Sequence, residues 1–238
     1  MQVNRARFPA ARPCAFPEGE MGPQRTGPEA GESIEAVIER RRTTLPKRLH
    51  LPGPDATELA RIVGAAAAAP DHGQLLPWRF VVVPASARSA LACAFEASLL
   101  ARDPLASSEQ REQARAKAFR SPTLLLAVAR LHHEHPEIPA AERLVSAGCA
   151  IQNMLLMATA LGYGSAITSG KAMSEAPLRS LFRLEDSEQA LCFVSIGTSA
   201  CNGPGKPRPD PERYFSALEV RPDGTSACVR ELTQSIPR

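Results

Sequence analysis

Residues 147–161 predict a helix that is apolar on nearly every side, and this feature constrains the fold more than any other. The strongly polar residues in this stretch are Gln152, Asn153 and Thr159. A helix that is apolar nearly all round is buried nearly all round, so we expect the other elements to pack about it. Gly162 follows the stretch, and glycine commonly ends a helix in this way.

The segment after this helix has two interpretations. Residues 162–170 read Gly-Tyr-Gly-Ser-Ala-Ile-Thr-Ser-Gly, which predicts a turn entering a short strand with exposed hydroxyls. A buried helix followed by such a turn at a sheet edge fits a ligand cradle. The same residues also fit a core helix with an ordinary turn, and hydrophobic periodicity does not choose between the two.

Composition sets the broad class of the protein. The chain has 238 residues, 44% of them hydrophobic, which allows one domain with a sizeable core plus tails. The net charge of +3 argues against a dedicated nucleic-acid-binding protein, which carries a clustered basic face. No apolar run reaches the roughly 18 residues that a membrane span needs, so we expect no membrane partner. The six scattered cysteines contain no CxxC pair and favour a reducing, cytoplasmic location.

Three segments differ in their content of proline and of periodic apolar residues. Residues 1–32 are rich in Pro, Gly and Arg, lack apolar periodicity, and are expected to be a disordered N-terminal extension. Residues 33–215 carry the periodic segments and are expected to form the domain. Residues 216–238 are expected to be a C-terminal tail. Within the domain, the Pro-rich segment 199–213 predicts an extended arm.

Helical and strand-like periods alternate through the domain. Asp55 and Glu58 are typical of a capping box at the start of a helix. Strands separated by helices indicate a layered α/β or α+β architecture. The expected helices span residues 33–42, 55–69, 86–102, 108–119, 147–161 and 174–182, and the expected buried strands span residues 79–84, 123–129 and 190–196.

The usual catalytic and nucleotide-binding motifs are missing from the sequence. It contains no GxGxxG, no Walker loop, no GxSxG elbow and no evident pair of carboxylates. If the protein is an enzyme, a cofactor therefore carries the chemistry. Arg and Lys beside hydroxyls suit a phosphate-bearing cofactor, because their donors complement phosphate oxygens. The candidate polar residues are Arg41, Arg42, Thr43, His72, Thr168, Ser169, Lys206 and Arg208.

The arginine run and a cluster of histidines can also be explained without a bound ligand. The run of arginines from Arg40 to Arg42 ends a predicted helix, where cations compensate the helix dipole. The cluster of His132, His133 and His135 lacks a closed set of metal ligands at a known spacing, so we expect a solvated loop and no metal.

Several blocks occur in a fixed order between residues 33 and 215, and the set is far more specific than any one block. They are Arg41-Arg42-Thr43, Ala69-Pro70-Asp71-His72, Pro77-Trp78-Arg79-Phe80, Ser146 to Ala150, Leu161 to Gly164, and Gly197-Thr198. Together they resemble the RRS motif, the APxxxxxQPWRF loop and strand, the central helix with its Gly-containing exit, and a late strand end of the nitroreductase family. The likeness is greatest to the small bacterial members with an APDH loop.

This resemblance implies an α+β fold with a mixed, largely antiparallel sheet flanked by helices, assembled as an intertwined homodimer. It implies two FMN sites at the dimer interface, each built from both subunits. It also implies a ping-pong reaction in which NAD(P)H is the electron donor. The acceptor would be a nitro compound, a quinone or a related small electrophile.

The resemblance also implies roles for particular residues, none of them catalytic and none of them a metal ligand. The FMN phosphate and the ribityl chain or ring edge would be held by Arg41, Arg42 and Thr43. The flavin of the partner subunit would lie beside Ala68 and His72. The flavin ring would be lined by Ile167, Thr168 and Ser169, and the phosphate would be reached by Lys206 or Arg208. NAD(P) would be contacted by Ala160, Leu161, Gly162, Tyr163, Gly164 and Ser165.

The chain departs from the family pattern at two informative places. Leu76 stands where the family has Gln, and Ile167-Thr168 stand where related proteins have Trp-Arg, which removes a charge near the flavin. Three alternatives therefore stay open. One is a flavin-binding protein with little or no turnover, one is a reductase specialised for a single metabolite, and one is a dimeric interaction module without flavin, in which the arginine run only ends a helix.

Overall fold

The computed structural model describes residues 33–131, 135–199, 207–220 and 227–231. The expected N-terminal extension, His132, His133 and Lys206 lie outside the described residues. The helices are α1 (Ile34–Arg40), α2 (Ala56–Gly64), α3 (Arg88–Arg102), α4 (Ser108–Ala116), α5 (Ala140–Ala160) and α6 (Ala176–Leu181). The strands are β1 (Leu49–His50), β2 (Trp78–Val82), β3 (Thr123–Arg130), β4 (Gly164–Thr168), β5 (Glu188–Ser199), β6 (Ser216–Val220) and β7 (Ala227–Glu231).

The ends of the helices follow local sequence signals. The Asp55 carboxylate accepts the Glu58 N–H at 2.8 Å, and the Glu58 carboxylate accepts the Asp55 N–H at 3.0 Å, so the predicted capping box is confirmed. Ser33 caps α1 by accepting the Ala36 N–H. Gly162, at φ 85°, adopts the left-handed conformation directly after α5, which confirms the predicted helix end.

The main sheet is antiparallel, and β5 lies at its centre. The strand order is β1-β5-β3-β2, and β4 also pairs with β5. β3 pairs with β5 from Glu188 to Ile196, while the other edge of β5 pairs first with β4 and then with β1. Thr43 adds an isolated parallel bridge to Ser165 at the outer side of β4.

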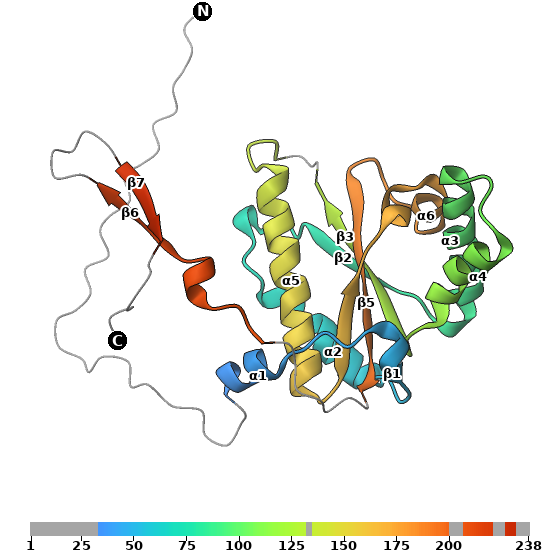
Figure 1. Cartoon of the computed structure of the whole chain (residues 1–238), viewed down its shortest axis with the longest axis horizontal. Helices are drawn as coiled ribbons and strands as arrows, with labels where there is room; N and C mark the ends of the chain where they lie inside the picture. The colour runs from blue at the N-terminus through green and yellow to red at the C-terminus, as the bar shows by residue number, and fades with distance from the viewer. Residues whose placement is uncertain (1–32, 132–134, 200–206, 221–226, 232–238) are drawn as a thin grey trace, which may run out of the picture.

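Helices cover both faces of this sheet, as Figure 1 shows, with α2 and α5 on one face and α3, α4 and α6 on the other. Alternate residues of β3 therefore enter two cores: Leu125 and Ala127 pack with α5, and Leu124 and Leu126 pack with α3. Burial on both faces explains why the strand reads as a continuous apolar run. The expected α+β fold with an antiparallel sheet flanked by helices is confirmed.

Helix α5 is longer than predicted, and in the single chain it is not buried all round. Its inner face is fully buried at Ala147, Ala150 and Met154. On its outer face, by contrast, Gly148 and Gln152 are exposed within the predicted stretch, and Val145, just before it, is 67% exposed. The prediction of burial on every side is therefore wrong for one subunit.

The C-terminal part of the chain differs from the expected tail. Strands β6 and β7 form an antiparallel hairpin, which projects away from the main body in Figure 1. Residues 207–210, within the predicted extended arm, have no regular secondary structure and lead into a short 3-10 turn, Pro211–Arg213. Hairpin formation was not evident from the sequence, because its partner strands are short and carry charged residues.

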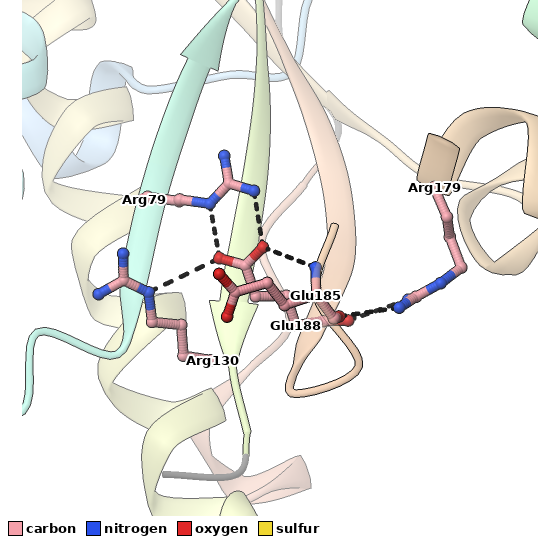
Figure 2. Close-up of polar contacts among 5 residues, drawn as sticks. All are labelled: Arg79, Arg130, Arg179, Glu185 and Glu188. Carbon is pink, nitrogen blue, oxygen red and sulfur yellow. Dashed lines mark hydrogen bonds and ion pairs between the residues drawn. The ribbon is translucent and has the colours of Figure 1, made fainter. Parts of the chain in front are cut away.

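A buried carboxylate joins three strands at the end of the sheet where β5 begins. Glu188 is 5% exposed, and Arg79 of β2 binds it through two parallel hydrogen bonds of 2.6 and 2.7 Å (Figure 2). Arg130 of β3 approaches the same carboxylate at 3.6 Å. Arg179 of α6 donates to the backbone oxygens of Glu185 and Glu188, which fixes the turn before β5.

This network also fixes a loop that the sequence marks as functional. Arg79 follows directly on Pro77 and Trp78, where the loop containing His72 enters β2. The Arg130 N–H donates to the Pro77 oxygen at 3.0 Å, so β3 holds the same strand end. The hydrogen bonds from Arg79 lower the pKa of the Glu188 carboxyl, against the opposing effect of burial.

We expect Glu188→Gln to lower the free energy of unfolding at neutral pH. The loss should be about 2–3 kcal/mol, because Arg79 and Arg130 are partly exposed and a fully buried broken pair gives roughly 3–5 kcal/mol. The pKa of Glu188 is lower in the folded than in the unfolded state, so its stabilisation is complete above the unfolded pKa of about 4.3 and is lost as pH falls through the folded pKa.

Urea unfolding of wild type and Glu188→Gln from neutral to acidic pH tests this expectation. The difference between the two proteins should shrink as the pH falls. Glu112→Gln is the matched control, since Glu112 is exposed on α4 and its replacement should change stability little. A difference that stays constant down to the acid transition would contradict a charged, paired Glu188.

Candidate functional site

One cavity of about 640 Å³ lies among α1, α5, β4 and the segment that follows residue 206. This volume falls within the range of about 300–1,000 Å³ that small-molecule sites occupy. Elements far apart in the sequence meet here, because α1 packs on the C-terminal end of α5 and β4 follows that end directly. The lining residues are Ile38, Glu39, Arg41, Thr43, Gln152, Leu155, Ser165, Ala166, Ile167, Arg208, Pro209 and Tyr214.

The three consecutive arginines at the end of α1 point to three different places. Arg40 donates to the Thr159 oxygen at 2.8 Å, at the C-terminal end of α5. Arg42 donates to the backbone oxygens of Glu39 and Arg41. Of the three, Arg41 is the one that lines the cavity. Dipole compensation thus explains Arg40 and Arg42, as expected for cations at helix ends, but it does not explain Arg41.

A fourth arginine reaches the same place from the C-terminal segment. The Arg208 guanidinium donates to the Arg41 oxygen at 2.6 Å, with longer contacts of 3.5 Å to the oxygens of Ile38 and Glu39. Burial, and then the positive charges of Arg208 and Arg42, lower the pKa of the Arg41 guanidinium. In the described part of the chain, no carboxylate forms an ion pair with any of these three arginines, although Glu39 lines the cavity.

Hydroxyl groups line the cavity beside Arg41. The Thr44 N–H donates to the Ser165 oxygen at 2.9 Å, which joins the segment after α1 to the edge of β4. This contact brings Thr43 and Ser165 together in the cavity wall. The Ser165 hydroxyl is buried and has no hydrogen-bond partner among the described residues. Such an orphaned group is available to a polar group of a bound molecule.

The chemistry of the cavity fits a molecule with an anionic end and a flat apolar part. Arg41 and Arg208 crowd positive charge, and neither forms an ion pair with Glu39 or another carboxylate of the described residues, so a phosphate would relieve their repulsion. Leu155, Ile167 and Tyr214 supply apolar surface elsewhere in the wall. A flavin mononucleotide carries both a phosphate and a planar ring, so the residues present fit this group.

The structure brings five of the predicted site residues together: Arg41, Thr43, Ser165, Ile167 and Arg208 all line the cavity. Thr168 and Ser169 continue the β4 edge without lining it, and Ala160, Leu161, Gly162, Tyr163 and Gly164 form the preceding helix end and turn. Ser165, which the family resemblance assigns to NAD(P), lies in the same wall as Arg41. Ala68 and His72 do not line the cavity of their own chain.

His72 lies in a loop whose conformation is tightly determined. Its Nδ1 lies 2.8 Å from a carboxylate oxygen of Glu142 in the first turn of α5. The Asp71 carboxylate accepts the N–H groups of Leu75 and Leu76, which closes the loop on itself. His72 remains exposed on the surface of the single chain. Its side chain is thus oriented by Glu142 yet open to a second molecule.

The backbone of this loop includes left-handed residues. Gly73 has φ 74°, and Gln74 and Leu76 have φ values of 53° and 47°. A Cβ at Gly73 would lie 2.8 Å from the Ile138 side chain, so a larger residue would displace it. Left-handed non-glycine residues cluster in functional loops, where the surrounding structure holds them.

The turn after α5 is fixed to α2 by a tyrosine. The Tyr163 hydroxyl donates to the Glu58 carboxylate at 2.5 Å, and this bond together with burial raises the pKa of Tyr163 to about 12. Next to it, a Cβ at Gly164 would come within 2.8–3.0 Å of Ser199 and Leu49. The turn predicted to contact NAD(P) is therefore held in one position directly beside the cavity.

Sequence reasoning missed seven of the residues that line the cavity. Only Gln152 carried a usable signal, because it is a polar residue inside a stretch that is otherwise apolar. The others come from the end of α1, from α5 and β4, and from the segment after residue 206: Ile38, Glu39, Leu155, Ala166, Pro209 and Tyr214.

The sequence predicts neither a metal site nor a membrane span, and the described residues bear on both. In residues 33–131, 135–199, 207–220 and 227–231, His, Cys, Asp and Glu nowhere gather in a group of three that could hold a metal ion. His135 is exposed and lies 3.0 Å from Glu137. Over the same residues, no helix is both long and apolar enough to cross a bilayer.

The fold and the cavity together define a class: an α+β domain with a cavity between α1, α5 and β4 whose lining suits a phosphate-bearing aromatic molecule. Comparison with known proteins gives the family. The profile of the nitroreductase family matches residues 38–198, and this chain belongs to that family.

The Escherichia coli K12 protein named "Putative NAD(P)H nitroreductase YdjA" is 32% identical over 170 residues, which cover 70% of this chain and 88% of that protein. A solved nitroreductase-like protein from Bacillus cereus has a TM-score of 0.68 at 19% identity and covers 81% of this chain and 100% of its own. A Bacteroides fragilis nitroreductase with bound FMN has a TM-score of 0.60 at 20% identity, with coverages of 79% and 100%.

Proposed function

We propose that this protein is an FMN-dependent oxidoreductase that uses NAD(P)H to reduce nitro compounds, quinones or related small electrophiles. The observation that carries the proposal is Arg41, which lines the cavity among like charges and beside an orphaned hydroxyl. Membership of the nitroreductase family and the FMN bound in the Bacteroides fragilis neighbour support it. When bound, FMN supplies hydride transfer between the donor and the acceptor.

In this proposal, the side chains bind and orient, and none is required as a general acid. Arg41 holds the phosphate with charge-assisted hydrogen bonds, and Arg208 adds positive potential beside it. Thr43 and Ser165 hydrogen-bond the polar chain. Ile167 and the other apolar residues of the wall exclude water from the ring. Arg42 contributes charge, since its guanidinium is bound to carbonyl groups of α1.

The other predicted contacts remain part of the proposal. The turn from Ala160 to Gly164 would contact NAD(P), because it is fixed beside the cavity by Tyr163 and Glu58. Thr168 and Ser169 would border the ring from the end of β4. Lys206, which lies outside the described residues, would approach the phosphate with Arg208.

We further propose a cytoplasmic homodimer in which each FMN site takes residues from both subunits. The outer faces of α1 and α5 expose Ile34 and Val145, each 67% exposed. This exposed apolar surface supports the proposed interface. Ala68 and His72, which do not line their own cavity, would then lie beside the flavin of the partner subunit. Cys93, Cys149 and Cys192 are free thiols, as expected in a reducing compartment.

A specific observation favours a second candidate, a flavin-binding protein with little or no turnover. Ile167 is 46% exposed in the cavity wall, and neither it nor Thr168 carries a charge. The part of the wall that β4 supplies therefore offers no cation to a developing negative charge on the ring. A reductase specialised for one metabolite fits the same wall, with the missing charge supplied by its substrate.

We expect the purified protein to bind FMN, to be yellow, and to bleach when NADH or NADPH is added without oxygen. Anaerobic visible spectra before and after each donor measure this directly, and addition of a quinone or nitroarene should restore the colour. Yellow protein that neither donor bleaches would support the binding protein. Colourless protein that FMN does not reconstitute would overturn the proposed function.

We expect mixed dimers to show that the sites are shared between subunits. Arg41→Ala should weaken FMN binding about tenfold or more, since a charge-assisted hydrogen bond contributes roughly 1.5–3 kcal/mol. His72→Ala should have a smaller effect, on the order of 1 kcal/mol, because its contact is neutral. In a dimer with one Arg41→Ala subunit and one His72→Ala subunit, one site contains both defects and the other contains neither.

Titration of such mixed dimers with FMN should therefore show half of the sites at wild-type affinity. The two subunits can carry different affinity tags, so that only mixed dimers are measured. Homodimers of each variant provide the reference affinities. Two equivalent, weakened sites in the mixed dimer would contradict a shared site, because each FMN would then take both residues from one subunit.

A further inference from the structure

Residues 207–215, here named the strap, form one wall of the cavity and are exposed along their length. Arg208, Pro209 and Tyr214 supply this wall. The strap lies beyond residue 198, where the match to the family profile ends.

A single side chain anchors the strap. In the described part of the chain, every hydrogen bond between residues 207–220 and the main body is donated by Arg208. The other hydrogen bonds of the strap are internal, such as those from Tyr214 and Phe215 to the Pro211 oxygen. Tyr214 is 70% exposed and Phe215 is 47% exposed, so apolar packing adds little.

This anchor is electrostatically strained. Arg208 binds the oxygens of Glu39 and Arg41, and Arg42 donates to the same two oxygens. Two guanidinium groups thus share one pair of carbonyls, with Arg41 directly beside them. The C-terminal end of α1 attracts cations, but only as a fraction of one charge. Docking of the strap therefore brings a third positive charge to a place where, among the described residues, neither Glu39 nor any other carboxylate forms an ion pair with it.

A phosphate monoester in the cavity changes this balance. It carries a charge of about −1.5 to −2 at neutral pH and would offset most of the repulsion among the arginines. We propose that the strap is a phosphate-dependent clamp: the FMN phosphate holds Arg208 on α1 and thereby closes residues 207–215 over the cavity. The inference rests on the proposed function. Because coupling is reciprocal, a docked strap raises the affinity for FMN by the same factor.

Trypsin reports directly on the position of the strap. The peptide bond after Arg213 lies within the strap and is exposed, whereas Lys206 and Arg208 are each followed by proline, which trypsin does not cleave. Apo-protein should be cut after Arg213 at a measurable rate, read by intact mass. Saturating FMN should slow this cut by about fivefold or more, the lower end of typical coupling between sites. Saturating riboflavin, which has the same ring without the phosphate, should leave the rate unchanged.

Variants distinguish the effect of the Arg208 anchor on trypsin cleavage from a general change in the stability of the protein. In Arg208→Ala, FMN should no longer slow the cut, even at concentrations that saturate the flavin site. Arg208→Lys keeps the charge without the planar set of donors and should protect partly. Arg61→Ala is the matched control, because Arg61 is exposed on α2 far from the strap in sequence, and it should retain full protection. Circular dichroism of each variant establishes that it folds, and the comparison of FMN with riboflavin needs no variant.

Flavin fluorescence in the same samples separates this inference from the proposed function. FMN that binds without slowing the cut, or that protects no better than riboflavin, would overturn the clamp and leave the proposed function standing. A strap that resists trypsin equally with and without FMN would also overturn it. Absence of FMN binding at any concentration would overturn both.

Discussion

Strand β5 is hydrogen-bonded along both edges, and the positions of the functional segments depend on this pairing. On one edge it pairs with β4 in a fixed register, Ser165 opposite Ile196 and Ile167 opposite Val194, which places both residues in the cavity wall. At its other end, Glu188 holds the strands next to the loop that carries His72. One buried strand thus positions the residues proposed to bind FMN within a subunit and the loop proposed to reach the partner.

The described part of the single chain has unpaired positive charge and exposed apolar surface in the same region, around α1. Arg41, Arg42 and Arg208 crowd positive charge at the end of α1, and none of the three forms an ion pair with a carboxylate among the described residues. The outer faces of α1 and α5 expose apolar side chains. An anion in the cavity would neutralise the positive charge, and a second subunit would cover the apolar side chains. Both corrections involve α1, so cofactor binding and assembly are expected to be linked in this protein.

The parts of the fold that rest on local physics could be predicted from the sequence. The capping box of Asp55 and Glu58 and the left-handed Gly162 depend on residues within a few positions of each other. The continuous apolar runs of β3 and β5 indicate strands buried on both faces.

The features that depend on distant contacts could not be predicted in this way. Periodicity cannot tell an apolar helix that is buried on every side from one that leaves an apolar face exposed, so the exposed side of α5 was missed. Three adjacent arginines look alike in sequence. In the structure, Arg40 binds the Thr159 oxygen and Arg42 binds a carbonyl of α1, which leaves Arg41 as the one that lines the cavity. Tyr214 joins the cavity from a segment with no local signal.

The central claim is that Arg41 makes this cavity a site for the phosphate of FMN. Equilibrium titration of apo-protein with FMN and with riboflavin, in wild type and in Arg41→Ala, tests it most directly. We expect wild type to prefer FMN by about tenfold or more and Arg41→Ala to lose most of that preference while its affinity for riboflavin is unchanged. An equal preference for FMN in both proteins would contradict the claim, because the phosphate would then be bound elsewhere.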